Sequence, residues 1–275
     1  MIRALAISAL AAGCFSEPPR PACNAARKLE IVNSAADDSG PWLSKDRREL
    51  IFASTRDGGS DLYRATRGDF DVPFDIPVRF GGDVNTSDDE GDPFVMPDGK
   101  TVWFASRRHG PGVGQIYVAT RNNRELTLDR EVTELGEGRH PSLTADGLTI
   151  YFEAYEATYP QIFTATRGSE SKPFGPSRVM TEIEVEALQF APAISADGNT
   201  LIFGTAPPNA AARLMRAYRG SNGLFGTPEA LDEVPAPITG NDTDPYLMPD
   251  DKTIVFASTR NPTGSNDNDI YVSCE

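Results

Sequence analysis

The stretch Pro93-Phe-Val-Met-Pro-Asp-Gly-Lys-Thr-Val-Trp-Phe-Ala-Ser-Arg107 contains the pattern on which the fold depends. It begins with a short apolar run, reaches Asp98-Gly99, and continues into a second apolar run that carries Phe104. Asp-Gly between two apolar runs is typical of a tight β-hairpin, because Gly tolerates the positive φ of such a turn. The stretch therefore predicts two antiparallel strands.

The same pattern occurs five times along the chain. Its copies begin at Pro41-Trp-Leu-Ser-Lys-Asp46, Pro93-Phe-Val-Met-Pro-Asp98, Pro141-Ser-Leu-Thr-Ala-Asp146, Pro192-Ala-Ile-Ser-Ala-Asp197 and Pro245-Tyr-Leu-Met-Pro-Asp250. Each Asp is followed six residues later by a Phe, namely Phe52, Phe104, Phe152, Phe203 and Phe256. Internal repetition at a period of roughly 50 residues indicates a repeat architecture.

Each repeat holds about four expected strands. A third strand is marked by the apolar pairs Leu62-Tyr63, Ile116-Tyr117, Ile162-Phe163, Leu214-Met215 and Ile270-Tyr271. A weaker fourth strand is expected at 76–80 and 178–180, and no long segment has helical periodicity. Four-stranded units at this period are blades, so the sequence predicts an all-β, five-bladed β-propeller with the recurrent Phe packed between blades.

The consensus Pro-x-apolar-x-x-Asp-Gly-x-x-apolar-x-Phe-x-Ser-x-Arg resembles the WD40-like repeat of TolB-type propellers. Its best copies start at Pro93 and at Pro245, and the resemblance covers residues 41–275. Repeats three and four depart from it, since Glu153-Ala-Tyr-Glu156 and Gly204-Thr-Ala-Pro207 replace Ser-x-Arg. The resemblance implies a fold and leaves the function open, because such propellers serve many functions.

Composition narrows the class of partner. The chain has 275 residues, 24 Gly, 22 Pro and a net charge of −14. So many Gly and Pro residues favour a turn-rich fold over a helical bundle. An acidic chain repels phosphate backbones, so nucleic acid is not an expected partner. No run of about 18 apolar residues exists to span a membrane as a helix.

The N-terminus reads as a targeting segment. Residues 1–13 have a positive start and an apolar run, as in a secretory signal peptide. Leu10-Ala-Ala-Gly-Cys14 resembles a bacterial lipobox, although Ala11 stands where Leu is usual, and the alternative is an ordinary signal peptide cut elsewhere. The resemblance implies an acylated Cys14. Phe15 after it favours the outer membrane, with residues 14–27 as a proline-rich tether.

The two chain ends are expected to meet in blade five. The fifth repeat stops after its third strand, and Lys28-Leu-Glu-Ile-Val32 looks like the missing fourth strand. The propeller would then span residues 28–275, with repeats starting near 41, 93, 141, 192 and 245. Such closure brings Cys23 near Cys274, where an oxidising envelope permits a disulfide; two free thiols are the alternative.

Loops that precede each blade are expected to gather at one mouth of the central channel. They carry the candidate binding residues Asp38, Asp89, Asp92, His140, Asp242 and Asp244. These acids favour a basic ligand or a divalent cation such as calcium, while a solvated acidic surface is the alternative. No metal ligand set can be assigned. Arg56 with Asp61, and Arg260 with Asp269, are expected to form structural ion pairs.

These observations favour a non-catalytic scaffold over an enzyme. There is no Gly-x-Ser-x-Gly motif, and the inner strands carry Trp42, Phe94 and Tyr246 rather than acids. The sequence therefore predicts a monomeric, lipid-anchored envelope protein that binds an envelope protein or a small ligand, with no required cofactor. The alternative is a glycan-binding or glycan-hydrolysing propeller that uses carboxylates at the mouth, with the three aromatic residues as stacking platforms.

Overall fold

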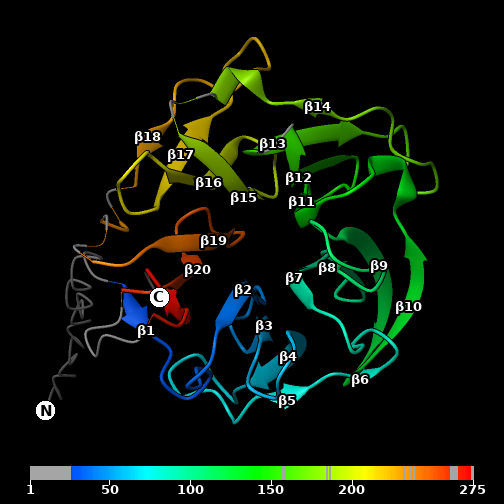
Figure 1. Cartoon of the computed structure of the whole chain (residues 1–275), viewed down its shortest axis with the longest axis vertical. Helices are drawn as coiled ribbons and strands as arrows, with labels where there is room; N and C mark the ends of the chain where they lie inside the picture. Colours follow the sequence, from blue (N-terminus) through cyan, green and yellow to red (C-terminus); the bar gives the residue numbers. More distant parts are fainter. Residues whose placement is uncertain are drawn as a thin grey trace, which may run out of the picture.

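The computed structural model describes residues 26–156, 159–183, 185, 187–231, 233–235, 237, 239–260 and 266–273. Cys14, Cys23 and Cys274 lie outside these residues, so the predictions of lipidation, tether and disulfide remain predictions. Five β-sheets surround a central axis as the blades of a propeller (Figure 1). The predicted all-β, five-bladed fold is confirmed.

The strands of each blade follow one another outward from the axis. Blade 1 contains β2 (Asp38–Leu43), β3 (Glu49–Ser54), β4 (Asp61–Thr66) and β5 (Val78–Arg79). Blade 2 contains β7 (Glu90–Val95), β8 (Thr101–Ser106), β9 (Gln115–Asn122) and β10 (Glu125–Glu131), with β6 (Gly81–Gly82) added parallel to β10. Blade 3 contains β11 (Arg139–Leu143), β12 (Thr149–Glu156), β13 (Tyr159–Thr166) and β14 (Arg178–Val179).

The remaining blades complete the ring. Blade 4 contains β15 (Leu188–Ile194), β16 (Thr200–Ala206), β17 (Arg213–Tyr218) and β18 (Glu229–Ala230). Blade 5 contains β19 (Asp242–Leu247), β20 (Ile254–Ser258), β21 (Asp269–Val272) and β1 (Arg27–Lys28). Two 3-10 turns, η1 (Thr133–Leu135) and η2 (Thr181–Ile183), are the helical elements of the described residues, and none of these is long enough to cross a membrane.

Blade 5 is closed by the start of the chain, as predicted. β1 pairs antiparallel with β21 through Arg27 opposite Val272 and Lys28 opposite Tyr271. The Lys28 ammonium also lies 2.7 Å from the Asp269 carboxylate. The strand is shorter than expected, because residues 29–32 form a turn that packs Leu29 and Val32 into the core. Closure leaves each innermost strand in contact with the innermost strand of the next blade.

The apolar core lies between blades. Five clusters of buried side chains each join one blade to its neighbour. The five recurrent Phe side chains have no exposed surface. Burial of a side chain of this size stabilises the fold by about 1.5–3 kcal/mol. The hydrophobic repeat in the sequence is therefore the repeat of the packing between blades.

Asp-Gly turns join the two inner strands of three blades. Gly99, Gly147 and Gly198 have φ of 68°, 65° and 77°, which L side chains adopt at a cost. The preceding aspartates accept hydrogen bonds from backbone N–H groups of the turn, for example Asp98 from Lys100 at 2.7 Å. Arg47 and Asp251 take a similar positive φ in the corresponding turns of blades 1 and 5, so all five inner strands begin at one mouth of the channel.

Candidate functional site

One residue of each blade is turned toward the axis by a bulge. The inner strands shift register just before their prolines, and the residue before the proline has φ between 48° and 55°. This is the bulge type whose first residue takes the left-handed conformation. The five residues, which we call the axial ring, are Gly40, Asp92, His140, Ala191 and Asp244.

His140 joins three blades across the axis. Its Nε2 atom lies 3.1 Å from Oδ1 of Asp92 and 3.0 Å from Oδ1 of Asp244. Its Nδ1 atom lies 3.2 Å from Oε2 of Glu153, without the geometry of a hydrogen bond. The His140 backbone N–H also donates to Asp92, at 3.2 Å. The structure thus brings together Asp92, His140 and Asp244, which lie far apart in the sequence.

Arg139 and Glu153 extend this cluster. The fully buried Glu153 carboxylate accepts from Nε of Arg139 at 2.8 Å and lies 2.6 Å from its Nη2 atom. Its other oxygen accepts from the backbone N–H of Ala191, at 3.3 Å. Three carboxylates therefore surround one imidazolium and one guanidinium, so the cluster carries an excess of negative charge when all of its groups are ionised.

Charge and burial shift the pKa values of these groups in opposite directions. Burial lowers the pKa of His140, but the carboxylates of Asp92 and Asp244 outweigh it and raise the pKa to about 10. Burial raises the pKa of Glu153, but His140 and Arg139 outweigh it and hold the pKa at about 2. The pKa of Asp92 is raised, because burial exceeds the stabilisation from His140 and Asp244 adds repulsion. His140 is thus a cation at neutral pH.

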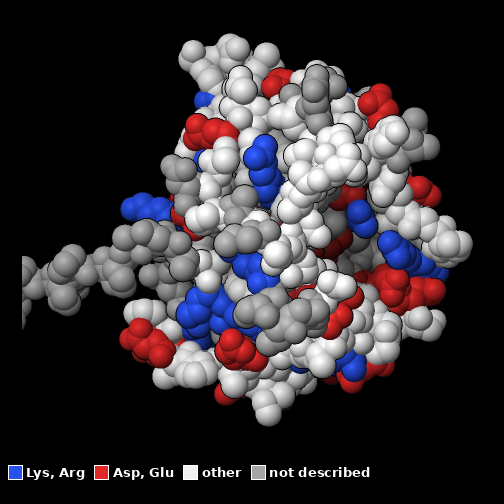
Figure 2. Space-filling view, turned by 60° about the vertical axis from the view of Figure 1, so that its left-hand side comes forward, with Lys and Arg blue, Asp and Glu red and all other residues white. Residues whose placement is uncertain are grey.

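Above the axial ring the mouth opens into a cavity of about 910 Å³. Six acidic side chains line it against two arginines and one histidine; they are Asp37, Asp89, Glu90, Asp92, Glu153 and Asp244, with Arg107, Arg139 and His140. Figure 2 shows a hollow on the right of its view, with acidic side chains in its depth and basic side chains at its edge. The cavity is therefore acidic.

Blades 3 and 4 give the mouth an apolar wall. Tyr155, Tyr159 and Leu188 are 43%, 62% and 37% exposed, and they line the cavity with Phe190. Tyr155 and Tyr159 lie at the ends of β12 and β13, which are two residues longer than β3 and β4. Phe190 packs over Gly204, where a Cβ would lie 2.1 Å from its ring. These four residues were not predicted from the sequence.

Asp38 and Asp242 were expected at the mouth, but the structure places them inside the blades. Neither has exposed surface. Asp38 pairs with Arg56 at 2.6 Å, and Asp242 pairs with Arg260 and accepts from Ser258 at 2.7 Å. Both are unavailable to a ligand, because a carboxylate buried so deeply must be paired inside the protein.

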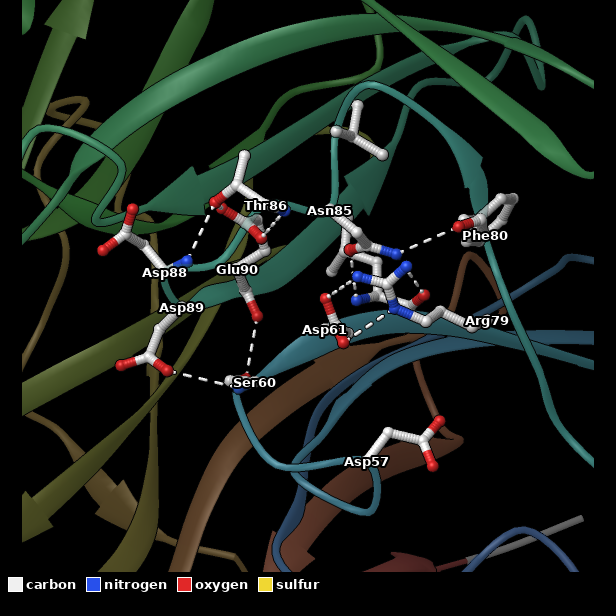
Figure 3. Close-up of polar contacts among 12 residues, drawn as sticks. Asp57, Ser60, Asp61, Arg79, Phe80, Asn85, Thr86, Asp88, Asp89 and Glu90 are labelled. Atoms are coloured by element: carbon white, nitrogen blue, oxygen red, sulfur yellow. Dashed lines mark hydrogen bonds and ion pairs between the residues drawn. The ribbon is translucent and has the colours of Figure 1, made fainter.

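The predicted Arg56–Asp61 pair is also wrong. Arg56 stacks over Phe52 and Tyr63 and pairs with Asp38 instead. Asp61 accepts two hydrogen bonds from Arg79, each of 2.7 Å (Figure 3). Arg260 binds Asp242 and stacks over Phe256, and Asp269 receives Lys28. The arginine of the Ser-x-Arg motif therefore pairs with a carboxylate of the inner strand and so fixes that strand to its own blade. We call this interaction the tie.

Asp89 is the expected mouth residue that stays accessible. Its side chain is 48% exposed and lies 3.2 Å from Arg107. It also accepts from the Ser60 backbone N–H, while Ser60 Oγ donates to the Glu90 carbonyl (Figure 3). Asp89 thus stands on a loop of blade 2 that is fixed to blade 1.

The three inner aromatic residues are not open stacking platforms at this mouth. Trp42 is 7% exposed and its ring centroid lies 6.1 Å from that of Tyr246. Phe94 and Tyr246 pack against neighbouring core clusters. All three lie beyond the axial ring, toward the other end of the channel, so the aromatic surface at the mouth comes from Tyr155 and Tyr159 instead.

No metal centre is assembled among the described residues. No group of three or more His, Cys, Asp or Glu side chains within them is placed to hold a metal ion. In the axial ring the imidazolium already fills the space between the carboxylates. Calcium at the mouth therefore remains a prediction.

Comparison with known proteins identifies the fold and no family. No family model matches the sequence, and no curated protein matches it. A solved structure described as a putative TolB from Agrobacterium tumefaciens is 17% identical, with a TM-score of 0.53 over 85% of this chain and 76% of that one. The chain spans about half the length of TolB from Acinetobacter baumannii, which is also 17% identical.

Glycoside hydrolases share the fold as well. The α-L-arabinofuranosidase of Podospora anserina, solved with cellotriose, has a TM-score of 0.58 and 10% identity over 90% of this chain and 94% of its own. A putative glycoside hydrolase from Parabacteroides distasonis has a TM-score of 0.54 and 10% identity, over 93% and 95%. At such identities the shared feature is the architecture. The chain is therefore a five-bladed β-propeller with the fold found in TolB and in propeller glycoside hydrolases.

Proposed function

We propose that the chain is a non-catalytic binding propeller of the bacterial cell envelope. Its mouth takes a basic segment of a partner protein, with a Lys or Arg directed at the axial ring and an apolar neighbour on the Tyr155–Tyr159 wall. The observation that carries this proposal is the geometry of the mouth, which combines unbalanced carboxylates with exposed aromatic surface. Aromatic residues are typical of the centres of protein interfaces.

The same geometry speaks against glycoside hydrolysis. Inverting enzymes hold two carboxyl groups roughly 6.5–9.5 Å apart, with room for water and the glycosidic bond between them. Here the His140 Nε2 atom contacts both Asp92 and Asp244 and occupies that space. Glu153, with a pKa near 2, is ionised at neutral pH and cannot act as a general acid.

Glycan binding is the second candidate, supported by the exposed tyrosines beside carboxylates. A screen with arabino- and xylo-oligosaccharides separates the candidates. Hydrolysis that Glu153→Gln abolishes would establish an enzyme and overturn the proposal. Binding without hydrolysis, lost in Tyr159→Ser, would establish a glycan-binding module.

A panel of basic peptides tests the mouth by calorimetry and thermal shift. We expect peptides with Lys or Arg beside an apolar residue to raise the melting temperature, because a ligand that binds only the native state stabilises it. Asp89→Asn and Tyr159→Ser should each weaken binding by about tenfold. Asp71→Asn and Tyr218→Ser are matched controls, since both residues are exposed and neither lines the mouth. Millimolar calcium should leave the melt unchanged.

Failure of the whole panel would overturn the basic-peptide proposal. A response to calcium alone would replace the peptide with a metal ion. A response equal in wild type and in Asp89→Asn would move the site elsewhere on the ring.

The envelope part of the proposal rests on the N-terminal sequence Leu10-Ala-Ala-Gly-Cys14. An acylated Cys14 would anchor the chain, since each buried methylene contributes about 0.8 kcal/mol. Cys14→Ser should therefore move the protein from the membrane fraction to the soluble fraction, while Cys23→Ser should not. Unchanged partitioning of Cys14→Ser would exclude the lipid anchor.

A further inference from the structure

The channel has a second cavity at the end opposite the mouth. Its volume is about 1020 Å³, and the C-terminal ends of the inner strands line it. Between the two ends, the axial ring and its prolines leave only about 30 Å³, which is room for about one water molecule. The two ends of the channel are therefore separate sites, and a ligand at one does not reach the other.

One wall of this second cavity is apolar. Val95, Met96, Leu143, Ile194 and Leu247, from blades 2 to 5, end the inner strands or directly follow them at this face. The turns beyond them line the cavity with four small or cyclic side chains, all exposed, namely Pro97, Ala145, Ala196 and Pro249. Blades 3, 4 and 5 thus offer mainly apolar surface to the cavity, and blade 2 adds Arg121 to its apolar residues.

The other wall is basic and belongs to blades 1 and 2. Five basic side chains line it, Lys45, Arg48, Arg64, Arg67 and Arg121, against the acids Asp46 and Glu49. Glu49 is shared, because one of its oxygens contacts Arg64 and the other lies 2.9 Å from Arg121. Lys45 takes the position that Pro97, Ala145, Ala196 and Pro249 hold in the other repeats. This wall carries a net positive charge in a chain of net charge −14.

The aspartates of the neighbouring turns do not cancel this charge at the cavity. Asp98, Asp146, Asp197 and Asp250 accept hydrogen bonds from their own turns and do not line the cavity. Asp46 lines it but accepts from Ser44 Oγ at 2.7 Å and from the Arg48 backbone N–H at 3.2 Å. Arg48 lies 3.6 Å from the exposed Asp69 carboxylate, and Arg121 shares Glu49 with Arg64, so the lining of the cavity keeps more cationic than anionic groups.

We propose that this cavity binds an amphiphilic anion, meaning a molecule with one carboxylate or phosphate head and an apolar body. The head would lie between Arg48, Arg121 and Lys45, because guanidinium groups bind such anions through paired hydrogen bonds. The body would cover the exposed apolar turn residues Pro97, Ala145 and Ala196. The volume suits a small ligand, since such pockets usually measure about 300–1,000 Å³. This site is independent of the proposed function of the mouth.

Three twelve-carbon probes with different heads test the proposal: dodecanoate, dodecyltrimethylammonium and dodecyl maltoside, each below its micelle concentration. Isothermal titration calorimetry on the full chain should show one saturable site for dodecanoate. The cationic and neutral probes should bind at least about tenfold more weakly. Dodecyl phosphate should bind at least as tightly as dodecanoate, because its head is also an anion and carries a charge of about −1.5 to −2 at pH 7.

Variants separate the two walls. Arg48→Gln and Arg121→Gln should each weaken dodecanoate by about tenfold and leave dodecyl maltoside unchanged. Ala196→Glu should weaken dodecanoate by adding a negative charge to the exposed rim. Arg178→Gln is the matched control, because Arg178 is 55% exposed beside Glu182 and lines another cavity. Asp89→Asn, at the mouth, should have no effect.

Equal binding of the three probes would overturn the proposal, because it would show apolar adsorption without recognition of the head. Binding that survives Arg48→Gln, Arg121→Gln and Ala196→Glu, with melts like the wild type, would also overturn it. Loss of peptide binding at the mouth with dodecanoate binding intact would refute the proposed function alone.

Discussion

The side chain of His140 lies between Asp92, Asp244 and Glu153, and without it these carboxylates would keep only Arg139 as a buried cation. Removing one partner of a buried ion pair costs about 3–5 kcal/mol, because the other charge stays buried without compensation. We expect His140→Gln to lower the free energy of unfolding at pH 7 by about 3 kcal/mol in urea denaturation. His109→Gln is the control, since His109 is exposed beside Glu131. Equal effects of the two changes would contradict this role.

The same histidine predicts how stability depends on pH. Its pKa is raised from 6.5 to about 10 in the folded state, so its contribution is fully present below pH 6.5 and is lost as pH rises through 10. Between these values the folded chain binds a proton that the unfolded chain has released. The free energy of unfolding should therefore fall with pH in the wild type and in His109→Gln, and fall less in His140→Gln. If the free energy of unfolding fell with pH in parallel in all three proteins, this prediction would be wrong.

The tie between an inner strand and its own blade is an element that three repeats share. In blades 1, 2 and 5 a buried carboxylate, a serine and an arginine stacked on aromatic rings hold the inner strand at the mouth; the carboxylates are Asp38, Glu90 and Asp242. Blades 3 and 4 have Gly138 and Gln189 at this position. Blades 3 and 4 lack this carboxylate, and they are the two blades that contain the aromatic wall and the Glu153 cluster.

The tie in blade 5 can be broken by a single change. Asp242→Asn keeps the shape but leaves Arg260 without its buried counter-charge, so it should lower the free energy of unfolding by about 3 kcal/mol. Asp251→Asn is the control, because Asp251 is exposed and Asn tolerates its φ of 55°. Urea denaturation measures both. A loss below about 1 kcal/mol for Asp242→Asn would show that Asp242 is not essential to the tie.

The sequence was sufficient for the blades and insufficient for the mouth. The Pro-led apolar runs and the recurrent Phe repeat five times and the Asp-Gly turns three times, and each depends on local chemistry, so these features were predictable without the structure. Whether an acid faces the channel or its own blade depends on the bulge of its inner strand, which in blade 5 places Asp244 on the axis and Asp242 inside the blade. The departures at Glu153 and Gly204 were visible, yet the wall of Tyr155, Tyr159, Leu188 and Phe190 emerges only when two long strands and a neighbouring blade are placed together.

Ring closure is the property of the whole molecule that depends on both chain ends. Arg27, four residues after Cys23, lies opposite Val272, two residues before Cys274. We expect a Cys23–Cys274 disulfide in the mature protein, detectable as a linked peptide in mass spectrometry of a non-reduced digest. A disulfide that closes the long loop between Cys23 and Cys274 would stabilise the fold by up to about 5 kcal/mol. Reductant should therefore lower the melting temperature of the wild type and leave Cys274→Ser unchanged. Free thiols at both positions would exclude the bond.

The left-handed backbone at the axial ring restricts how this protein can diverge. Every blade presents its axial residue through the same bulge, and β-branched side chains avoid positive φ strongly. Gly, Asn, Asp and His are tolerated there, and the ring also accommodates Ala191, whereas Val, Ile and Thr are disfavoured. Even with so few residue types allowed at each of five positions, many different arrangements of charge around the axis are possible. Descendants of this chain can therefore change what the channel recognises by single substitutions, while the five clusters between blades keep the scaffold constant.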